Sequence, residues 1–108
     1  MIVQIYSIYD SVSQSFVTPF YMHNDGLAIR AFSDNVNDSQ GGNLFKHSEQ
    51  FTLFHLGEFD DSDASILLND AGPKAIALGV EVKEPEKVVQ FTNDEIDQIK
   101  RFMQEKAQ

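Results

Sequence analysis

Three histidines are the residues of this sequence best suited to binding a metal or transferring a proton near neutral pH. His23, His47 and His55 are scattered, and no His-x-x-x-His or similar pair places two imidazoles on one ion. The acidic stretch DDSD, residues 60–63, offers oxygen ligands but lacks the later glycine and bidentate glutamate of an EF-hand calcium loop. We therefore predict neither a metal site nor a cofactor.

Catalytic motifs are also absent from the sequence. The chain has no cysteine, which excludes a thiolate nucleophile, a disulfide and a thiolate zinc site. It contains no glycine-rich phosphate loop followed by Lys and Ser or Thr, and no Gly-x-Ser-x-Gly elbow. The sequence therefore predicts a binding protein with no catalytic residues rather than an enzyme.

Charge restricts the partners that such a protein can bind. The chain has 17 acidic and 8 basic residues, a net charge of −9 and a sequence pI near 4.5. Up to Pro73 only Arg30 and Lys46 are cationic, against ten carboxylates, whereas from Lys74 onward six cations nearly balance seven carboxylates. The first two-thirds of the chain should therefore repel a phosphate backbone.

Aromatic residues on the expected strands are candidates for stacking on nucleic-acid bases. Because such platforms normally come with a cationic groove, which these strands lack, core packing is favoured for most of the rings. Tyr21 and one of Tyr6 or Tyr9 are the expected exceptions. The candidate contacts to nucleic acid or to a partner are Tyr21, Arg30, Lys46, His47, Lys100 and Arg101.

Two hairpins and one helix would position these residues. IVQIYSIY, residues 2–9, predicts an interior strand, and FVTPFYM, residues 16–22, predicts its hairpin partner, which lies at an edge or ends near Pro19. A helix should start near Asn24 and Asp25 and run to about Val36. Its core-facing side is expected to carry Ala28, Ile29, Phe32, Asn35 and Val36.

The second half of the chain continues the sheet and ends in a helix. FTLFHLGEF, residues 51–59, predicts a central strand, and DDSD turns the chain into ASILL for a second hairpin. Residues 74–82 fit a strand or a short helix, and 83–91 a linker or extended arm. Thr92 and Glu95 form a capping box before an apolar stripe of Ile96, Ile99, Phe102 and Met103. That stripe either folds back on the chain's own sheet or contacts a partner or second copy.

The predicted fold is α+β, with a small antiparallel sheet of about four strands in β-β-α-β-β order, one helix on a face and an appended C-terminal amphipathic helix. Residues 1–82 form a single domain, and residues 83–108 supply the arm and last helix. No basic region leads into an apolar run and cleavage site, and no stretch of about eighteen apolar residues occurs. We expect a soluble, intracellular protein without membrane contact.

Several short motifs recur together in a known order: IYSIYD, then TPFYMHNDGLAIRAFSDNVND, then FKHSEQFTLFHLGEFDD. In residues 2–61 the sequence resembles the small nonstructural proteins of gokushovirus-type Microviridae, bacteriophages with single-stranded DNA genomes. The resemblance implies a protein of the host cell cytoplasm that is described as DNA-binding or as supporting single-stranded genome synthesis. The matching polar positions are Asp10, Asn24, Asp25, Arg30, Asp38, Lys46 and His47.

Two functions follow as alternatives. The first is a replication accessory protein that binds single-stranded DNA through strand aromatics and the cations near Arg30, Lys46 and the last helix, with affinity that collapses with salt. The second is an acidic adaptor that binds the viral initiator, procapsid or a host replication factor, or forms a homo-oligomer, without contacting DNA. Acidic DNA mimicry is a third reading that fits the charge alone.

Overall fold

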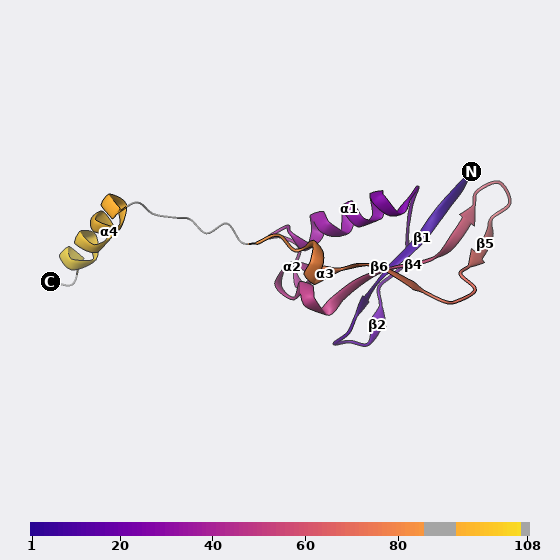
Figure 1. Cartoon of the computed structure of the whole chain (residues 1–108), viewed down its shortest axis with the longest axis horizontal. Coiled ribbons are helices and arrows are strands. Elements are labelled where there is room, and N and C mark those ends of the chain that lie inside the picture. The colour runs from indigo at the N-terminus through magenta and orange to yellow at the C-terminus, as the bar shows by residue number, and fades with distance from the viewer. Residues whose placement is uncertain (86–92, 107–108) are drawn as a thin grey trace.

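The computed structural model describes residues 1–85 and 93–106 of the chain (Figure 1). The strands are β1 (Ile2–Asp10), β2 (Ser15–Phe16), β3 (Phe20–Met22), β4 (Phe51–Asp60), β5 (Ser65–Leu68) and β6 (Lys74–Leu78). The helices are α1 (Asp25–Val36), α2 (Asn43–Lys46), the 3-10 turn η1 (Ser48–Gln50), α3 (Gly79–Val82) and α4 (Asn93–Lys106). The predicted α+β class is confirmed.

The antiparallel sheet is four strand positions wide, with β1 and β4 at its centre. Both β2 and β3 pair with the outer side of β1, while β5 and β6 pair with the outer side of β4. The first outer strand predicted from the sequence is therefore present but interrupted, as β2 and β3, and the second is present as β5, with β6 added on the same side of β4. The interruption spans residues 17–19 and includes Pro19, which confirms the edge position expected from its missing N–H group.

Helix α1 starts at the predicted cap. The side chain of Asn24 accepts a hydrogen bond of 2.9 Å from the backbone N–H of Leu27, and Asp25 lies in the first turn. Ala28, Phe32 and Val36 are buried, as their helical spacing predicts. The predicted core position of Asn35 is wrong, because Asn35 is exposed and its amide donates to the carbonyl of Ala31 at 2.9 Å.

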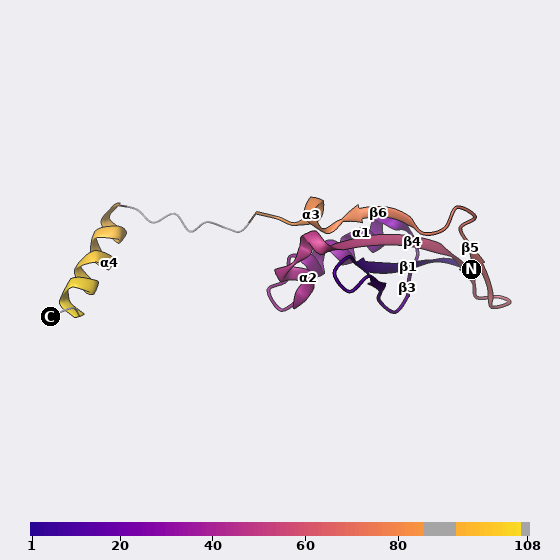
Figure 2. The same ribbon diagram turned by 90° about the horizontal axis from the view of Figure 1, so that it is seen from below.

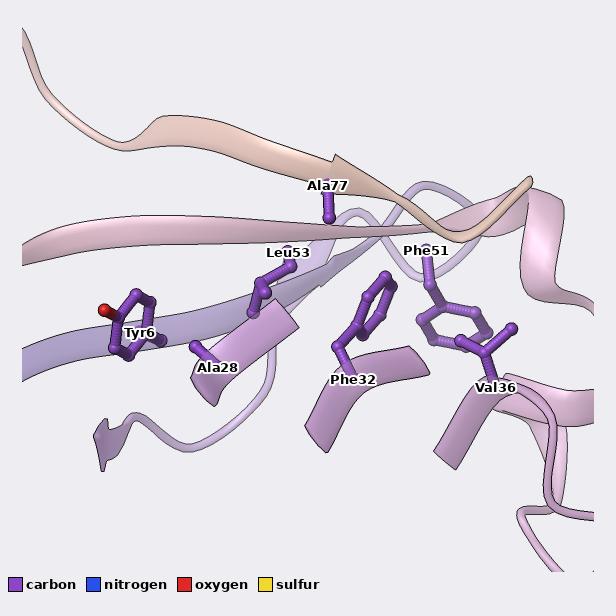
Figure 3. Close-up of a cluster of buried hydrophobic side chains, with 7 residues drawn as sticks. All are labelled: Tyr6, Ala28, Phe32, Val36, Phe51, Leu53 and Ala77. Atoms are coloured by element: carbon purple, nitrogen blue, oxygen red, sulfur yellow. The ribbon is translucent and has the colours of Figure 1, made fainter. Parts of the chain in front are cut away.

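The hydrophobic core lies between α1 and the sheet face that α1 covers (Figure 3). Burying each large apolar side chain contributes about 1.5–3 kcal/mol, so this layer supplies the main driving force for folding. No charged residue belongs to the cluster, which comprises Tyr6, Ala28, Phe32, Val36, Phe51, Leu53 and Ala77.

Residues 74–82 adopt both of the conformations that the sequence left open. The chain is a strand from Lys74 to Leu78 and a short helix from Gly79 to Val82. Gly79 is buried at the junction, where a Cβ atom would overlap the carbonyl of Ser48. A glycine is therefore required for the helix to begin this close to η1.

The helix α2 was not predicted from the sequence, and part of the C-terminal region lies outside the described residues. No helix was predicted between Val36 and the strand that starts at residue 51, yet α2 begins directly after Gly42, which has φ of 63° and provides no side-chain cap. The C-terminal helix is confirmed as α4. Its predicted cap, Thr92, and most of the predicted arm, residues 86–91, lie outside the described residues.

A candidate nucleic-acid interface on the open face of the sheet

One face of the sheet packs on α1, and we call the opposite one the open face. Side chains alternate between the faces along each strand, and the cross-strand pairings carry this alternation across the sheet. The strand positions that share the open face are Val3, Ile5, Ser7, Tyr9, Phe16, Tyr21, Thr52, Phe54, Gly57, Phe59, Ile66, Leu68, Ala75 and Leu78.

None of these strand positions carries a charged side chain. Figure 2 views the sheet from the side of the open face, and α1 lies behind the strands. Several apolar side chains are consequently exposed, including Phe16 at 46%, Tyr21 at 53%, Ile66 at 58% and Leu68 at 62%. An uncharged, apolar surface of this kind on a protein with a net charge of −9 is a candidate contact site.

Aromatic rings form two groups on the open face. Tyr9, Phe16 and Phe54 make the first group, with centroid distances of 4.9 Å for Tyr9 to Phe16, 5.4 Å for Phe16 to Phe54 and 6.3 Å for Tyr9 to Phe54. Tyr21 and Phe59 make the second, with centroids 5.8 Å apart. The prediction of exposure is confirmed for Tyr21, and the other exception is Tyr9, because Tyr6 is fully buried.

Two β1 residues that lie between the aromatic groups on the open face, Ile5 and Ser7, pack below the level of the rings. Ile5 and Ser7 are buried although they belong to the open face. The Ser7 hydroxyl donates a hydrogen bond of 2.7 Å to the carbonyl of Val17, which fastens the interrupted edge to β1. The aromatic groups are therefore carried by paired strands and not by a loop.

The cations predicted from the sequence lie elsewhere. Arg30 is exposed on α1, and Lys46 is exposed at the end of α2, which packs against α1. His47 follows α2, and its Nδ1 lies 4.0 Å from a carboxylate oxygen of Glu49. These three residues are thus on the α1 side of the sheet, while Tyr21 is on the open face. The structure does not bring them into one site.

Helix α4 carries the remaining predicted residues. Lys100 and Arg101 are exposed. The apolar stripe is also exposed, with values of 37% for Ile96, 44% for Ile99, 58% for Phe102 and 67% for Met103.

A polar cleft of about 900 Å³ lies on the other side of the sheet, between the start of α1 and the loop joining β5 to β6. Sequence reasoning missed this site because its polar residues are far apart in the chain. The only signal was two histidines, His23 and His55, which were separately assigned to a cap region and a strand. The lining residues are Gln4, His23, Asn24, Asp25, Gly26, His55, Asn69, Ala71, Gly72, Pro73 and Lys74.

Hydrogen bonds fix the polar side chains of this cleft. With His55 neutral, its Nε2 donates to the Gln4 side-chain oxygen at 2.7 Å and its Nδ1 accepts from the Asn69 amide at 3.0 Å. The buried Tyr6 hydroxyl donates to Asp25 at 2.7 Å, and burial, followed by this carboxylate, raises the pKa of Tyr6. Both ring nitrogens of His55 form hydrogen bonds within the protein. The imidazole therefore has a fixed orientation in the wall of the cleft, and neither nitrogen is available to act as a base.

The described residues show neither a cluster of metal ligands nor a helix that could cross a membrane. Among residues 1–85 and 93–106, no three or more His, Cys, Asp or Glu side chains are grouped closely enough to hold a metal ion. Within the same part of the chain, no helix combines the length and apolar character needed to cross a membrane.

The fold and the open face define a class of protein: a small α+β domain whose antiparallel sheet is covered by helices on one side and presents aromatic rings on the other. The sequence model of the Phage ORF5 protein family matches residues 3–82, and the chain belongs to that family. The match includes every strand of the sheet except the first residue of β1. No curated protein and no solved structure matches the chain.

Proposed function

We propose that this phage protein supports replication of a single-stranded DNA genome as a non-enzymatic binding module, acting in the cytoplasm of the bacterial host. Membership of a phage family supports the setting. The likeness of residues 2–61 to nonstructural proteins of gokushovirus-type Microviridae supports the genome type. The working surface in this proposal is the open face.

Single-stranded DNA is the ligand that we place first, and the observation that carries this choice is the position of the rings. Tyr9 and Phe54 project from the two central strands on the uncovered face of a four-position antiparallel sheet. RNA-recognition motifs bind bases with aromatic side chains on such a sheet, and stacking contributes about 1–3 kcal/mol per base. The likeness to that architecture is one of geometry only.

Electrostatics makes this mode of binding unusual. The net charge of −9 repels DNA at long range, but Glu58 and Asp60 on β4 alternate away from the open face, where the strand positions are uncharged. Stacking on a neutral surface releases few counterions, since no Lys or Arg contacts a phosphate there. Added salt screens the remaining repulsion. We therefore expect affinity that is constant or rises with salt, in place of the collapse expected if Arg30 and Lys46 supplied the site.

The test is fluorescence anisotropy of a labelled oligonucleotide titrated with the full chain from about 20 mM to about 500 mM NaCl, a range over which the Debye length falls severalfold. Phe16→Ser, at an exposed ring, should weaken binding by about 5-fold or more. The matched control is Arg30→Ala with Lys46→Ala, which should bind as the wild type does. Loss of binding in the control alone would move the site to the α1 side.

A protein partner is the second candidate, favoured by the aliphatic end of the open face. Ile66 and Leu68 are exposed and cannot stack on bases as aromatic rings do. An apolar patch with an acidic surround suits a basic partner such as a viral initiator, procapsid or host replication factor. Absence of oligonucleotide binding at every salt concentration, together with loss of phage single-stranded DNA synthesis in an Ile66→Ser phage, would favour this function.

A further inference from the structure

Among residues 1–85 and 93–106, two surfaces of the chain carry exposed apolar side chains. One is the open face. The other is the side of α4 that carries Ile96, Ile99 and Met103, which are 37%, 44% and 67% exposed. Exposing two such surfaces in water is unfavourable, because each buried apolar square ångström contributes about 25 cal/mol.

The two surfaces match in size and charge. Helix α4 has 14 residues and is therefore about 21 Å long, which fits along the 10-residue strand β4 of about 33 Å. With successive residues about 100° apart, Lys100 and Glu95 flank the apolar side on its two edges, whereas Asp94 and Asp97 lie away from it. Docking this side on the uncharged open face would therefore keep the carboxylates of Asp94 and Asp97 in water and place Glu95 and Lys100 at the rim of the contact.

The chain leaves the sheet on the side of α1, and its own open face lies on the other side. The Lys83 ammonium donates to the carbonyls of Val36 at 3.0 Å and Phe45 at 2.9 Å. The side-chain amide of Asn37 donates a hydrogen bond of 3.0 Å to the carbonyl of Val82, and its oxygen accepts one of 2.7 Å from the backbone N–H of Glu84. These bonds tie the exit of the domain to the C-terminal end of α1, opposite the open face.

We propose that α4 docks on the open face of a second copy of this chain, so that two copies exchange their last helices in a two-fold dimer. A two-fold arrangement buries both open faces and both helices, and it doubles the area of a contact that is small on its own. The like charges of the two copies stay outside the contact, because the open face is neutral.

Exchange of α4 has a consequence that rests on the proposed function. The docked helix covers the Tyr9, Phe16 and Phe54 group, so DNA and dimerisation compete for the open face. By linkage, an oligonucleotide that binds only the uncovered face shifts the equilibrium from dimer to monomer.

The absence of native cysteine allows a direct test by disulfide cross-linking in the full chain. Phe16→Cys and Met103→Cys are made on separate chains, one of which carries a size tag, and the two are mixed, allowed to exchange and oxidised. The mixed disulfide should form at least 5-fold faster than either homodimer, as seen on a non-reducing gel. Faster Phe16→Cys homodimers, or monomeric cross-linking when both cysteines are on one chain, would overturn the exchange.

Sedimentation velocity tests the dimer without cysteines. The wild type should sediment as a dimer at micromolar concentration and Ile99→Asp as a monomer with an unchanged circular dichroism spectrum. Gln98→Asp, on the polar side of α4, is the matched control and should remain dimeric. If the wild type is monomeric and still binds the oligonucleotide, the dimer is wrong and the proposed function stands. If the wild type is a dimer that does not bind DNA, the proposed function is wrong and the dimer stands.

Discussion

Phe16 and Phe54 reach the open face from strands on opposite sides of β1, and their rings meet edge to face with centroids 5.4 Å apart and an interplanar angle of 72°. Tyr9, on β1 between them, contacts both rings. The first aromatic group therefore spans three adjacent strands, and a base stacked on it would touch residues that are far apart in the sequence.

Replacing Phe16 with Ser should weaken oligonucleotide binding while leaving the fold intact. Its side chain is 46% exposed, so the loss of buried area is small, whereas a lost stacking partner costs about 1–3 kcal/mol of binding. Anisotropy measures the affinity and thermal melting the stability. Val12→Ser, at a side chain that is 69% exposed in the neighbouring turn, is the control. Equal affinities for the two variants would contradict the role of the ring.

Removing the Tyr6 hydroxyl should destabilise the domain. Tyr6→Phe leaves the carboxylate of Asp25 without its 2.7 Å donor, at a cost of about 1–3 kcal/mol for a hydrogen bond to a charged group. Urea unfolding followed by circular dichroism gives the free energy of unfolding. A Tyr9→Phe variant, whose hydroxyl lies outside this pair, should be close to the wild type.

Alkaline pH should expose the same hydrogen bond. Burial, and then the bond to Asp25, raises the pKa of Tyr6 in the folded state. A raised pKa gives stability that is complete below the unfolded value of about 10 and is lost as the pH rises above it. The free energy of unfolding should therefore fall more steeply above pH 10 in the wild type than in Tyr6→Phe. Parallel curves would show that Tyr6 does not titrate with unfolding.

Gly57 should be intolerant of even a single methyl group. A Cβ atom at this position would overlap the carbonyl of Leu67 and crowd the Cα of Leu68, because β5 passes directly over it. Gly57→Ala should cost about 1–3 kcal/mol, as overpacking usually does, and should loosen β5. Amide hydrogen exchange of residues 65–68 reports this change, and a variant as protected as the wild type would refute the close approach.

The cap of α1 should contribute measurably to stability. Asn24→Ala removes the acceptor for the Leu27 N–H and should cost about 0.5–2 kcal/mol, whereas Asn24→Ser keeps an acceptor and should recover most of the loss. Thermal melting of the three proteins is sufficient. An alanine variant as stable as the wild type would show that water replaces the cap without cost.

The longest elements, α1, β1, β4 and α4, were predictable from local patterns, whereas the relationships between them were not. Asn24 and the spacing of Ala28, Phe32 and Val36 predicted α1, β-branched and aromatic content predicted β1, and alternation predicted β4. The two faces of the sheet could not be told apart, since the sequence does not show which one α1 covers. Tyr6 and Tyr9 illustrate this limit: both look like strand aromatics, but one is in the core and the other on the open face.

The polar cleft and the positions of the cations relative to the aromatic rings could not be predicted either, because both are set by contacts between residues far apart in the sequence. Gln4 and His55 are 51 residues apart in the chain yet share a hydrogen bond across β1 and β4. Arg30 and Tyr21 are near in sequence but lie on opposite sides of the sheet. Composition and spacing alone therefore could not separate a cationic DNA site from a neutral stacking surface.

The most direct test of the central claim is a nuclear magnetic resonance titration of the isotope-labelled full chain with a short single-stranded oligonucleotide. We predict that amide and ring signals of Tyr9, Phe16 and Phe54 shift, while those of Arg30 and Lys46 stay in place. Shifts confined to the α1 side, or no shifts at any oligonucleotide concentration, would contradict DNA binding on the open face.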